Sequence, residues 1–219
     1  MLLGCGAVLD HCAMALAATG WSSRVRRFAG TGDENRLAIL EVVDQSPPES
    51  HLELADAIAT RRADRRPFTT PRLSGTLELL HIRAARMQVE LAVVPRLRWA
   101  RLDDRDVVLR YGNGAGSDTP VDDAVMVALG TVRDDDAMRL RAGEALSRVV
   151  LTAAAMGLAS CPLTEPLRDN TSRLALACEV FDGEAHPQAL IRIGLPTSDD
   201  DPPPLTSRRT VGETTTWGP

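Results

Sequence analysis

The sequence contains no lysine, so arginine carries all 25 basic charges of this 219-residue chain. Any phosphate or carboxylate that the protein holds with a cation must therefore be held by a guanidinium group, whose planar fork presents paired N–H donors. The 30 acidic residues outnumber the basic ones, which gives a formal net charge of −5 and a pI near 5.4. This balance argues against a general nucleic-acid-binding protein, because such a protein needs a basic face.

Long apolar runs, metal-ligand spacings and targeting signals are also missing. No stretch of about twenty apolar residues occurs, which excludes a membrane-spanning helix, and the first residues do not form a signal peptide. The four cysteines, Cys5, Cys12, Cys161 and Cys178, have no metal-binding spacing among themselves or with the four histidines. We therefore expect a cytoplasmic protein without a metal, whose cysteines are reduced and packed in the core or in a pocket.

Hydropathy patterns predict a chain of mixed helices and strands. Helices are predicted at residues 4–21, 52–62, 76–85 and 137–158, and strands at 24–28, 37–43, 87–94, 125–129 and 188–193. Residues 95–105 and 111–118 are expected to be irregular, with the glycines of 112–116 forming a turn or a flap. The prolines of segment 46–51 predict a linker, and residues 199–219 form a polar, proline-rich tail.

Two of the predicted helices resemble each other. Residues 4–21 and 141–158 align without a gap, so that Gly6 lies opposite Gly143. Both segments are rich in small residues and close at a glycine, which predicts two equivalent central helices that pack closely. Any two alanine-rich core helices would also align this well.

The strongest chemical signal is a cluster of four arginines, Arg61, Arg62, Arg65 and Arg66, within six residues. Their positive charges repel one another unless an anion or several carboxylates lie among them. A phosphate is one natural partner, because it accepts two parallel N–H donors from a guanidinium fork. The alternative is a solvated basic helix end, where arginines suit the helix dipole.

Two further segments complete the candidate site. Arg208 and Arg209 follow Pro202–Pro204, a stiff spacer that could bring these arginines back to the first cluster. After the last predicted helix, Pro162 and Pro166 predict an extended loop whose backbone N–H groups could meet the polar edge of a flat ring. Cys161 in the same stretch has no neighbouring base, so we do not expect a catalytic thiol.

Together, residues 57–68, 142–160 and 186–196 and the Arg208–Arg209 tail resemble the Acg-type branch of the nitroreductase family. The resemblance implies an α+β fold, a three-layer α/β/α sandwich with a mostly antiparallel central sheet and long central helices. It implies FMN as cofactor and NAD(P)H as reductant, with the flavin passing hydride to a nitro compound, quinone or related acceptor. The flavin does the chemistry in such enzymes, and no catalytic side chain is assigned.

The resemblance also implies which residues contact FMN. The phosphate contacts correspond to Arg61, Arg62, Ala63, Arg65, Arg208 and Arg209, and the loop at the flavin ring corresponds to Pro162, Leu163, Thr164 and Glu165. Ala63 stands where the family usually has a serine or threonine. One hydrogen bond to the phosphate is therefore expected to be missing.

The family's upstream segment, which covers the flavin from the partner half, has no counterpart in this sequence. Residues 1–45 are therefore expected to be the remnant of a first nitroreductase-like half, and residues 52–219 the FMN-binding half. The flavin pocket would then be completed in a homodimer or by a partner chain, with a small molecule as substrate and no nucleic acid or membrane as partner. A non-catalytic FMN-sequestering protein, or a relic that binds nothing, are the alternatives.

Overall fold

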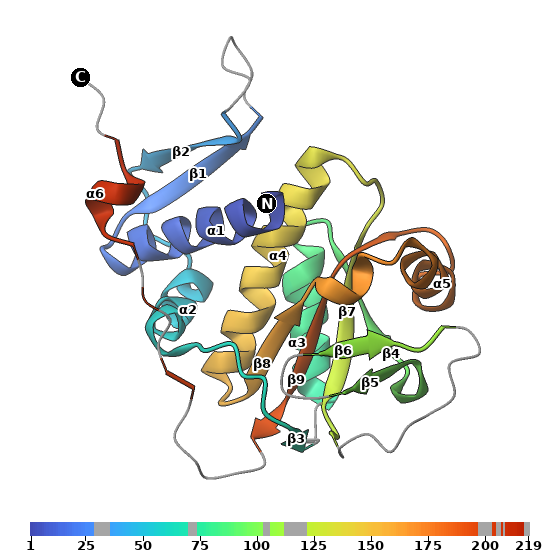
Figure 1. The fold of residues 1–219 in the computed structure, drawn as a ribbon. Helices are drawn as coiled ribbons and strands as arrows, with labels where there is room; N and C mark the ends of the chain where they lie inside the picture. The colour runs from blue at the N-terminus through green and yellow to red at the C-terminus, as the bar shows by residue number, and fades with distance from the viewer. Residues whose placement is uncertain are drawn as a thin grey trace.

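The computed structural model describes residues 1–28, 36–69, 74–102, 106–111, 122–196, 203–204, 207 and 209–216. Its centre is a five-stranded sheet in which every pair of strands is antiparallel (Figure 1). The strand order is β3 (Phe68–Thr69), β9 (His186–Pro196), β7 (Val125–Thr131) and β4 (Glu90–Val94), and β8 (Ala159–Leu163) also pairs with β9. The long strand β9 therefore joins three of the others.

Helices cover both faces of this sheet. Successive side chains of a strand point to opposite faces, and six of the seven residues of β7 are buried, so both faces must be covered. On β7, Val127 and Leu129 pack against α3 (Ser74–Ala85) and α4 (Asp136–Ala155). Met126 and Ala128 point the other way, toward α5 (Asn170–Val180) and a hairpin of β5 (Trp99–Arg101) and β6 (Val107–Leu109). This arrangement confirms the expected α+β class with a mostly antiparallel sheet and long central helices.

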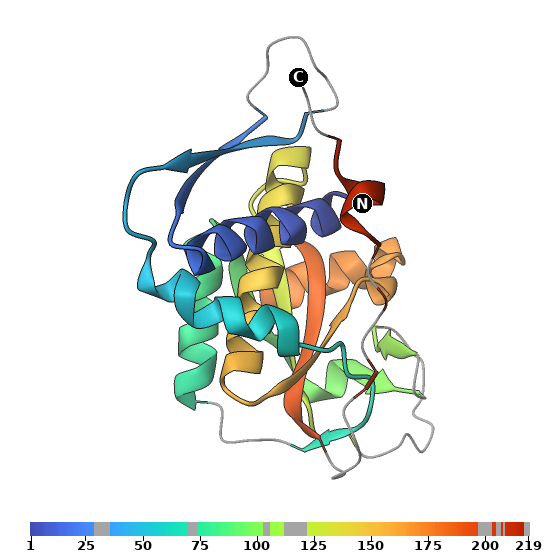
Figure 2. The ribbon, with the colours of Figure 1, turned by 90° about the vertical axis from the view of Figure 1, so that its left-hand side faces the viewer.

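The first part of the chain lies outside these layers and packs on α4. Helix α1 (Leu2–Ala18) crosses α4, and α2 (Glu49–Thr60) lies beside both (Figures 1 and 2). Met14, Leu54 and Leu151, one from each of α1, α2 and α4, form a small separate core. Between α1 and α2 the chain forms an antiparallel ribbon of β1 (Ser22–Arg27) and β2 (Ala38–Val43). The tail carries one short helix, α6 (Val211–Thr214).

Helices α1 and α4 touch through their backbones. A Cβ added to Gly6 would lie 2.0 Å from the Leu140 carbonyl oxygen, and one added to Gly143 would lie 2.1 Å from the Leu3 carbonyl oxygen. The gap-free alignment of the two helices pairs Gly6 with Gly143, and Leu3 and Leu140 are the residues directly before its two segments. The contact is therefore reciprocal, as at a two-fold symmetric interface, and the close packing predicted for the two helices is confirmed.

Buried ion pairs reinforce this junction. Arg148 on α4 donates from Nε to Oδ1 of Asp10 on α1 over 2.6 Å, and both side chains are buried. Arg27 at the end of β1 forms a two-pronged pair with Glu144, with both distances 2.6 Å. Such fork geometry fixes orientation as well as charge, so α1 and β1 are held to α4 in one register.

His51 on α2 belongs to the same polar group. Its Nε2 lies 2.8 Å from Nη2 of Arg148, and burial, together with the charges of Arg148 and Arg83, lowers the pKa of His51 to about 4. The unfolded chain, with a histidine pKa of about 6.5, takes up the proton first as the pH falls. His51 therefore favours the folded state fully above pH ~6.5 and loses this contribution between ~6.5 and ~4.

We expect the urea midpoint of the wild-type protein to fall more steeply over this pH range than that of His51→Gln. Equilibrium unfolding of both proteins at several pH values measures the difference. Parallel pH profiles would show that the His51 ring is not held neutral in the fold.

Some sequence expectations were wrong. Helix α2 begins at Glu49 and so takes up the last three residues of the expected linker 46–51. The expected irregular stretch 95–105 contains a 3-10 turn at Arg96–Arg98 and strand β5. Helix α5 was not predicted, although Asp169 caps it by accepting from the Ser172 N–H. The glycines of 112–116, expected to form a flap, lie outside the described residues.

The cysteines divide into two kinds. Cys161 is 1% exposed, and burial raises the pKa of its thiol, which makes it unreactive. Cys5 is half-buried, whereas Cys12 and Cys178 are exposed, contrary to the expected packing in the core. All four are free thiols.

Candidate functional site

The arginine-rich segment does not continue helix α2. The helix ends at Thr60, and Arg61 is already extended, with φ −60° and ψ 133°. Ala63 then forms a parallel bridge with Ser160 on β8, and the Asp64 N–H donates to the Ser160 carbonyl over 3.0 Å. The segment is therefore laid along the edge of β8, close to the main sheet, rather than extended into solvent as a helix end.

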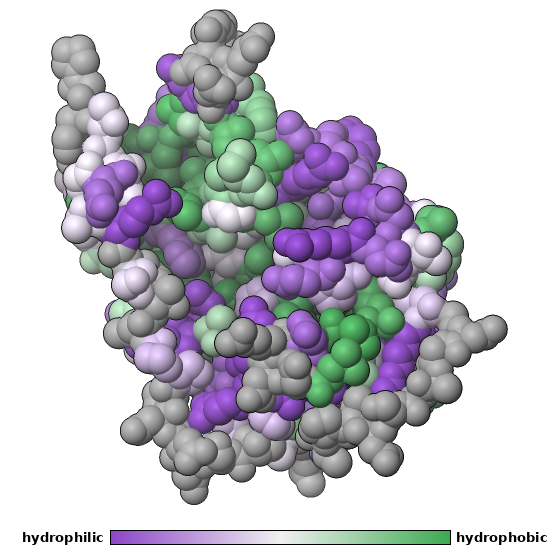
Figure 3. Space-filling model, in the orientation of Figure 1, coloured by the Kyte–Doolittle hydropathy of each residue, from purple (hydrophilic) through white to green (hydrophobic). Residues whose placement is uncertain are grey.

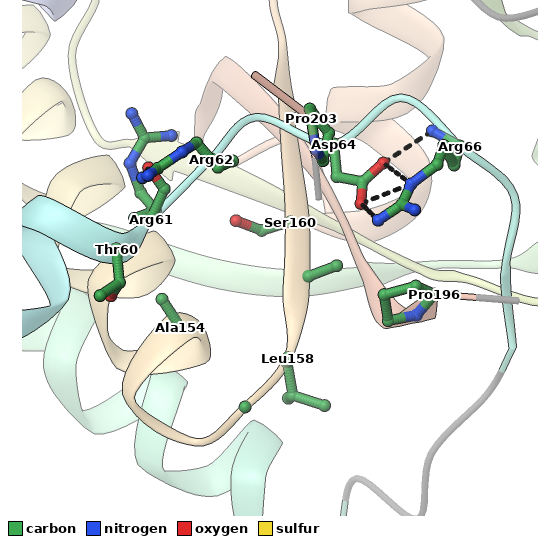
Figure 4. A pocket seen from close by; sticks show the side chains of 12 residues that line it. Thr60, Arg61, Arg62, Asp64, Arg66, Ala154, Leu158, Ser160, Pro196 and Pro203 are labelled. Carbon is green, nitrogen blue, oxygen red and sulfur yellow. Dashed lines mark hydrogen bonds and ion pairs between the residues drawn. The ribbon is translucent and has the colours of Figure 1, made fainter. Parts of the chain in front are cut away.

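Asp64 accounts for one of the four positive charges. Its buried carboxylate accepts from the Arg66 side chain at Nε and at Nη2, the latter over 2.7 Å, and from the Arg66 backbone N–H over 2.9 Å (Figure 4). Arg62 instead donates to the carbonyl oxygens of Ala59 and Arg61, over 2.8 and 3.0 Å. Arg62 thus caps the last helical turn, as expected for a basic helix end.

A cavity of about 210 Å³ opens beside this segment. Arg61 and Arg62 lie on one side of it, and the turn from α4 into β8 lies on the other (Figure 4). Pro203 also lines it, so the proline-rich tail does return to the first arginine cluster. The full lining is Thr60, Arg61, Arg62, Asp64, Arg66, Ala154, Gly157, Leu158, Ala159, Ser160, Pro196 and Pro203.

Two buried arginines that the sequence analysis missed, Arg192 and Arg101, donate hydrogen bonds to backbone carbonyls of the arginine segment. Arg192 on β9, 1% exposed, donates to the Arg66 carbonyl over 2.9 Å and pairs with the fully buried Asp122 over 2.5 Å. Arg101 on β5, 3% exposed, donates from Nε to the Arg65 carbonyl over 3.2 Å. Burying a charged side chain without a partner costs free energy. The position of Arg192 within the apolar run of β9 was therefore a sequence signal that this side chain has a buried partner.

The segment expected to form a loop at the flavin ring is arranged differently. Pro162 and Leu163 belong to strand β8, where Leu163 pairs with Leu190 of β9. The Thr164 N–H, expected to point at a ring, donates to Oε2 of Glu165 over 3.0 Å. Hydrogen bonds from the backbone N–H groups of Glu165 and Thr164 hold the pKa of the Glu165 carboxyl below its usual range.

Strand β8 connects the two halves of the candidate site. Ser160 lines the arginine cavity, and Thr164, four residues further along, is about 13 Å away at the usual strand rise. Thr164 lines a second cavity of about 530 Å³, and Glu165 lines a third of about 320 Å³. The arginine cavity and the Thr164 backbone therefore lie toward opposite ends of β8, whereas Arg65 is close enough to Glu165 for its charge to help lower the pKa of that carboxyl.

Four expected phosphate contacts, Ala63, Arg65, Arg208 and Arg209, are not part of the described lining of the arginine cavity. Arg65 and Arg209 are exposed, and neither belongs to its described lining. Arg208 lies outside the described residues. The described ranges contain no cluster of acidic, histidine or cysteine side chains that could bind a metal, and none of their helices has the length and apolar character that a bilayer crossing requires.

No protein-family model matches the chain. It is 37% identical to a Mycobacterium tuberculosis protein named "Putative NAD(P)H nitroreductase Rv3131", over 99% of this chain and 77% of that protein. It is 35% identical to another protein of that organism, "Putative NAD(P)H nitroreductase acg", over 97% of this chain and 79% of the relative. The alignments span 265 and 266 positions, so the relatives contain internal residues that this chain lacks.

Solved structures share the fold at low sequence identity. A protein from Desulfovibrio desulfuricans described as a "putative nitroreductase in complex with fmn" matches with a TM-score of 0.53 and 18% identity, over 76% of this chain and 96% of that chain. The FMN- and NADPH-dependent nitroreductase NfnB from sphigopyxis sp. strain HMH matches with a TM-score of 0.51 and 17% identity, over 75% and 98%. On its sequence relatives and its fold, the chain belongs to the nitroreductase family, in the Acg-type branch.

Proposed function

We propose that this protein binds FMN and acts as an oxidoreductase that passes hydride from NAD(P)H to a nitro compound, a quinone or a related acceptor. One observation carries the proposal: Arg61 and Arg62 line a cavity at one end of β8, and that strand leads to the backbone of Thr164 and Glu165. The names of the relatives and the FMN bound to a structural neighbour point in the same direction.

The cavity fits one part of FMN. Its volume of about 210 Å³ is below the range of about 300–1,000 Å³ usual for whole small-molecule sites, so it suits the phosphate end and not the ring. Arg61 and Arg62 would hold the phosphate through their guanidinium forks, and the flavin ring would extend along β8 toward Thr164. Arg65, Arg208 and Arg209 stay predicted phosphate contacts.

When bound, FMN would supply the two-electron chemistry, and the residues of this chain would hold and orient it. Arg192 and Arg101 fix the carbonyls of Arg66 and Arg65, which keeps the phosphate-binding segment in place before any ligand arrives. Preorganisation of this kind lowers the entropic cost of binding.

A second candidate, storage of FMN without turnover, is favoured by Glu165. Its carboxylate already accepts from the Thr164 N–H, the donor that the family resemblance assigns to the ring edge. If this contact persists, the protein would lack one donor that stabilises negative charge on a reduced flavin. Bleaching of the yellow, FMN-loaded protein by NADPH supports the oxidoreductase, and colour that NADPH and NADH leave unchanged supports storage.

We also propose that residues 1–45 are the remnant of a first half and that their outer face binds a second copy of the chain or a partner protein. Apolar side chains gather over α1 and the β1–β2 ribbon (Figure 3). Val8, Trp21 and Val42 in this region are 61%, 52% and 53% exposed. Exposed apolar patches of this kind are typical of interaction sites. The size of the protein in solution tests the homodimer.

The double variant Arg61→Ala/Arg65→Ala is expected to lose FMN. Each hydrogen bond from a charged group contributes about 1.5–3 kcal/mol, so the affinity for FMN should fall by roughly a hundredfold or more. Affinity for riboflavin, which lacks the phosphate, should change little. Quenching of flavin fluorescence on titration with protein measures both constants.

A matched control is Arg26→Ala/Arg133→Ala, which removes two exposed, ion-paired arginines that do not line the cavity. Its affinity for FMN should equal that of the wild-type protein. Retention of stoichiometric FMN by Arg61→Ala/Arg65→Ala would show that the phosphate is held elsewhere.

A further inference from the structure

Ser160 has a buried hydroxyl without a hydrogen-bond partner. The residue is 1% exposed, and its Oγ is among the buried polar atoms for which the described structure provides no donor or acceptor. A polar group buried in this way costs roughly 1–3 kcal/mol, and native proteins rarely leave one without an explanation. The hydroxyl is therefore expected to gain a partner that belongs to the functional state.

The place of Ser160 identifies the kind of partner. It lines the same cavity as Arg61 and Arg62, and in Figure 4 its hydroxyl points to the side of β8 on which these two arginines lie. Guanidinium groups can only donate hydrogen bonds. A hydroxyl that donates to a shared anion would complete a site in which all three side chains serve the same acceptor.

Ser160 also lies directly opposite Ala63 in the arginine segment. The backbone of Ala63, a residue without a hydroxyl group, forms a bridge with the backbone of Ser160. The adjacent Asp64 N–H donates to the Ser160 carbonyl over 3.0 Å, which fixes β8 against the motif. The neighbouring strand β8 thus offers a hydroxyl beside a segment that has none at Ala63.

We infer that the Ser160 hydroxyl is a ligand of the FMN phosphate and takes over the hydrogen bond that Ala63 cannot make. This assignment rests on the proposed function, because it requires FMN to bind with its phosphate in the arginine cavity. It adds a binding residue that the arginine motif and the loop at the flavin ring do not contain.

The test compares FMN with riboflavin in Ser160→Ala. Loss of one hydrogen bond to a charged group should weaken FMN binding roughly 10- to 100-fold, while riboflavin binding stays within about twofold of the wild-type value. Without ligand, Ser160→Ala should unfold at the same urea concentration as the wild-type protein or at a higher one, because no hydrogen bond is broken.

Thr152→Val provides the matched control. Thr152 is also a buried residue whose hydroxyl has no partner in the described structure, but it does not line the cavity. Its removal should leave FMN binding unchanged.

Two results would overturn the inference while leaving the proposed function intact: unchanged FMN binding by Ser160→Ala, or equal weakening of FMN and riboflavin binding. Unchanged FMN binding would mean that the Ser160 hydroxyl forms its hydrogen bond with water and not with the phosphate. A wild-type chain that binds neither flavin would instead overturn the proposed function, and the phosphate assignment with it.

Discussion

Gly6→Ala is expected to lower the free energy of unfolding by about 3 kcal/mol or more, because the added methyl group overpacks a backbone contact. The new Cβ would lie 2.0 Å from the Leu140 carbonyl oxygen and 2.9 Å from the Gly143 Cα. Both are backbone atoms, so α1 must move away from α4 as a whole. Gly143→Ala should have a similar effect, since its Cβ would meet the Leu3 carbonyl oxygen.

Gly4→Ala is the control on the same helix. A Cβ at Gly4 meets nothing within 4 Å, so this variant should be neutral or gain up to about 1 kcal/mol from alanine's higher helix propensity. Urea unfolding followed by circular dichroism gives all three values. Equal stabilities of Gly4→Ala and Gly6→Ala would show that α1 does not pack on α4 as described.

Asp122→Asn is the second substitution with a large expected effect. The carboxylate is fully buried, pairs with Arg192, and accepts from the backbone N–H groups of Phe68 and Ala124 over 3.2 Å each. Asparagine keeps the shape but leaves the Arg192 charge buried without a counter-ion, which typically costs about 3–5 kcal/mol. Stacking of the Arg192 guanidinium on Phe68, 4.6 Å from the ring centre, compensates only in part.

The exposed pair of Arg26 and Glu41 offers a comparison. Glu41→Ala removes one partner in solvent and should cost less than about 1 kcal/mol. The double variant Asp122→Asn/Arg192→Met should recover part of the loss, because it removes the unpaired charge as well. If Asp122→Asn is no more destabilised than Glu41→Ala, the buried pair does not make the large contribution to the free energy of unfolding that is expected here.

The sequence predicted those elements whose signal is local. Apolar periodicity and a closing glycine located α1 and α4, and short apolar runs located β7 and the interior of β9. The gap-free alignment predicted that the two helices pack closely, and in the structure the aligned glycines Gly6 and Gly143 lie at their contact. Helix α5 was missed because only Leu176 and Ala177 are buried along it, too few for a periodic pattern.

The candidate site was predictable only where the residues are neighbours in the chain. The arginine motif was visible as a charge run, but its pairing with β8 depends on a bridge across almost one hundred positions, from Ala63 to Ser160. The partners of Arg192, which are Arg66 and Asp122, are also far from it in the sequence. Contacts of this kind follow from the folded sheet and leave no spacing in the sequence.

The reciprocal contact of α1 and α4 changes how the junction responds to dilution. In an assembly of separate subunits, a two-fold helix contact dissociates as the protein concentration falls. Here both helices belong to one polypeptide, so each finds the other at a fixed effective concentration set by the connecting chain. The core that they share therefore persists however scarce the protein is in the cell.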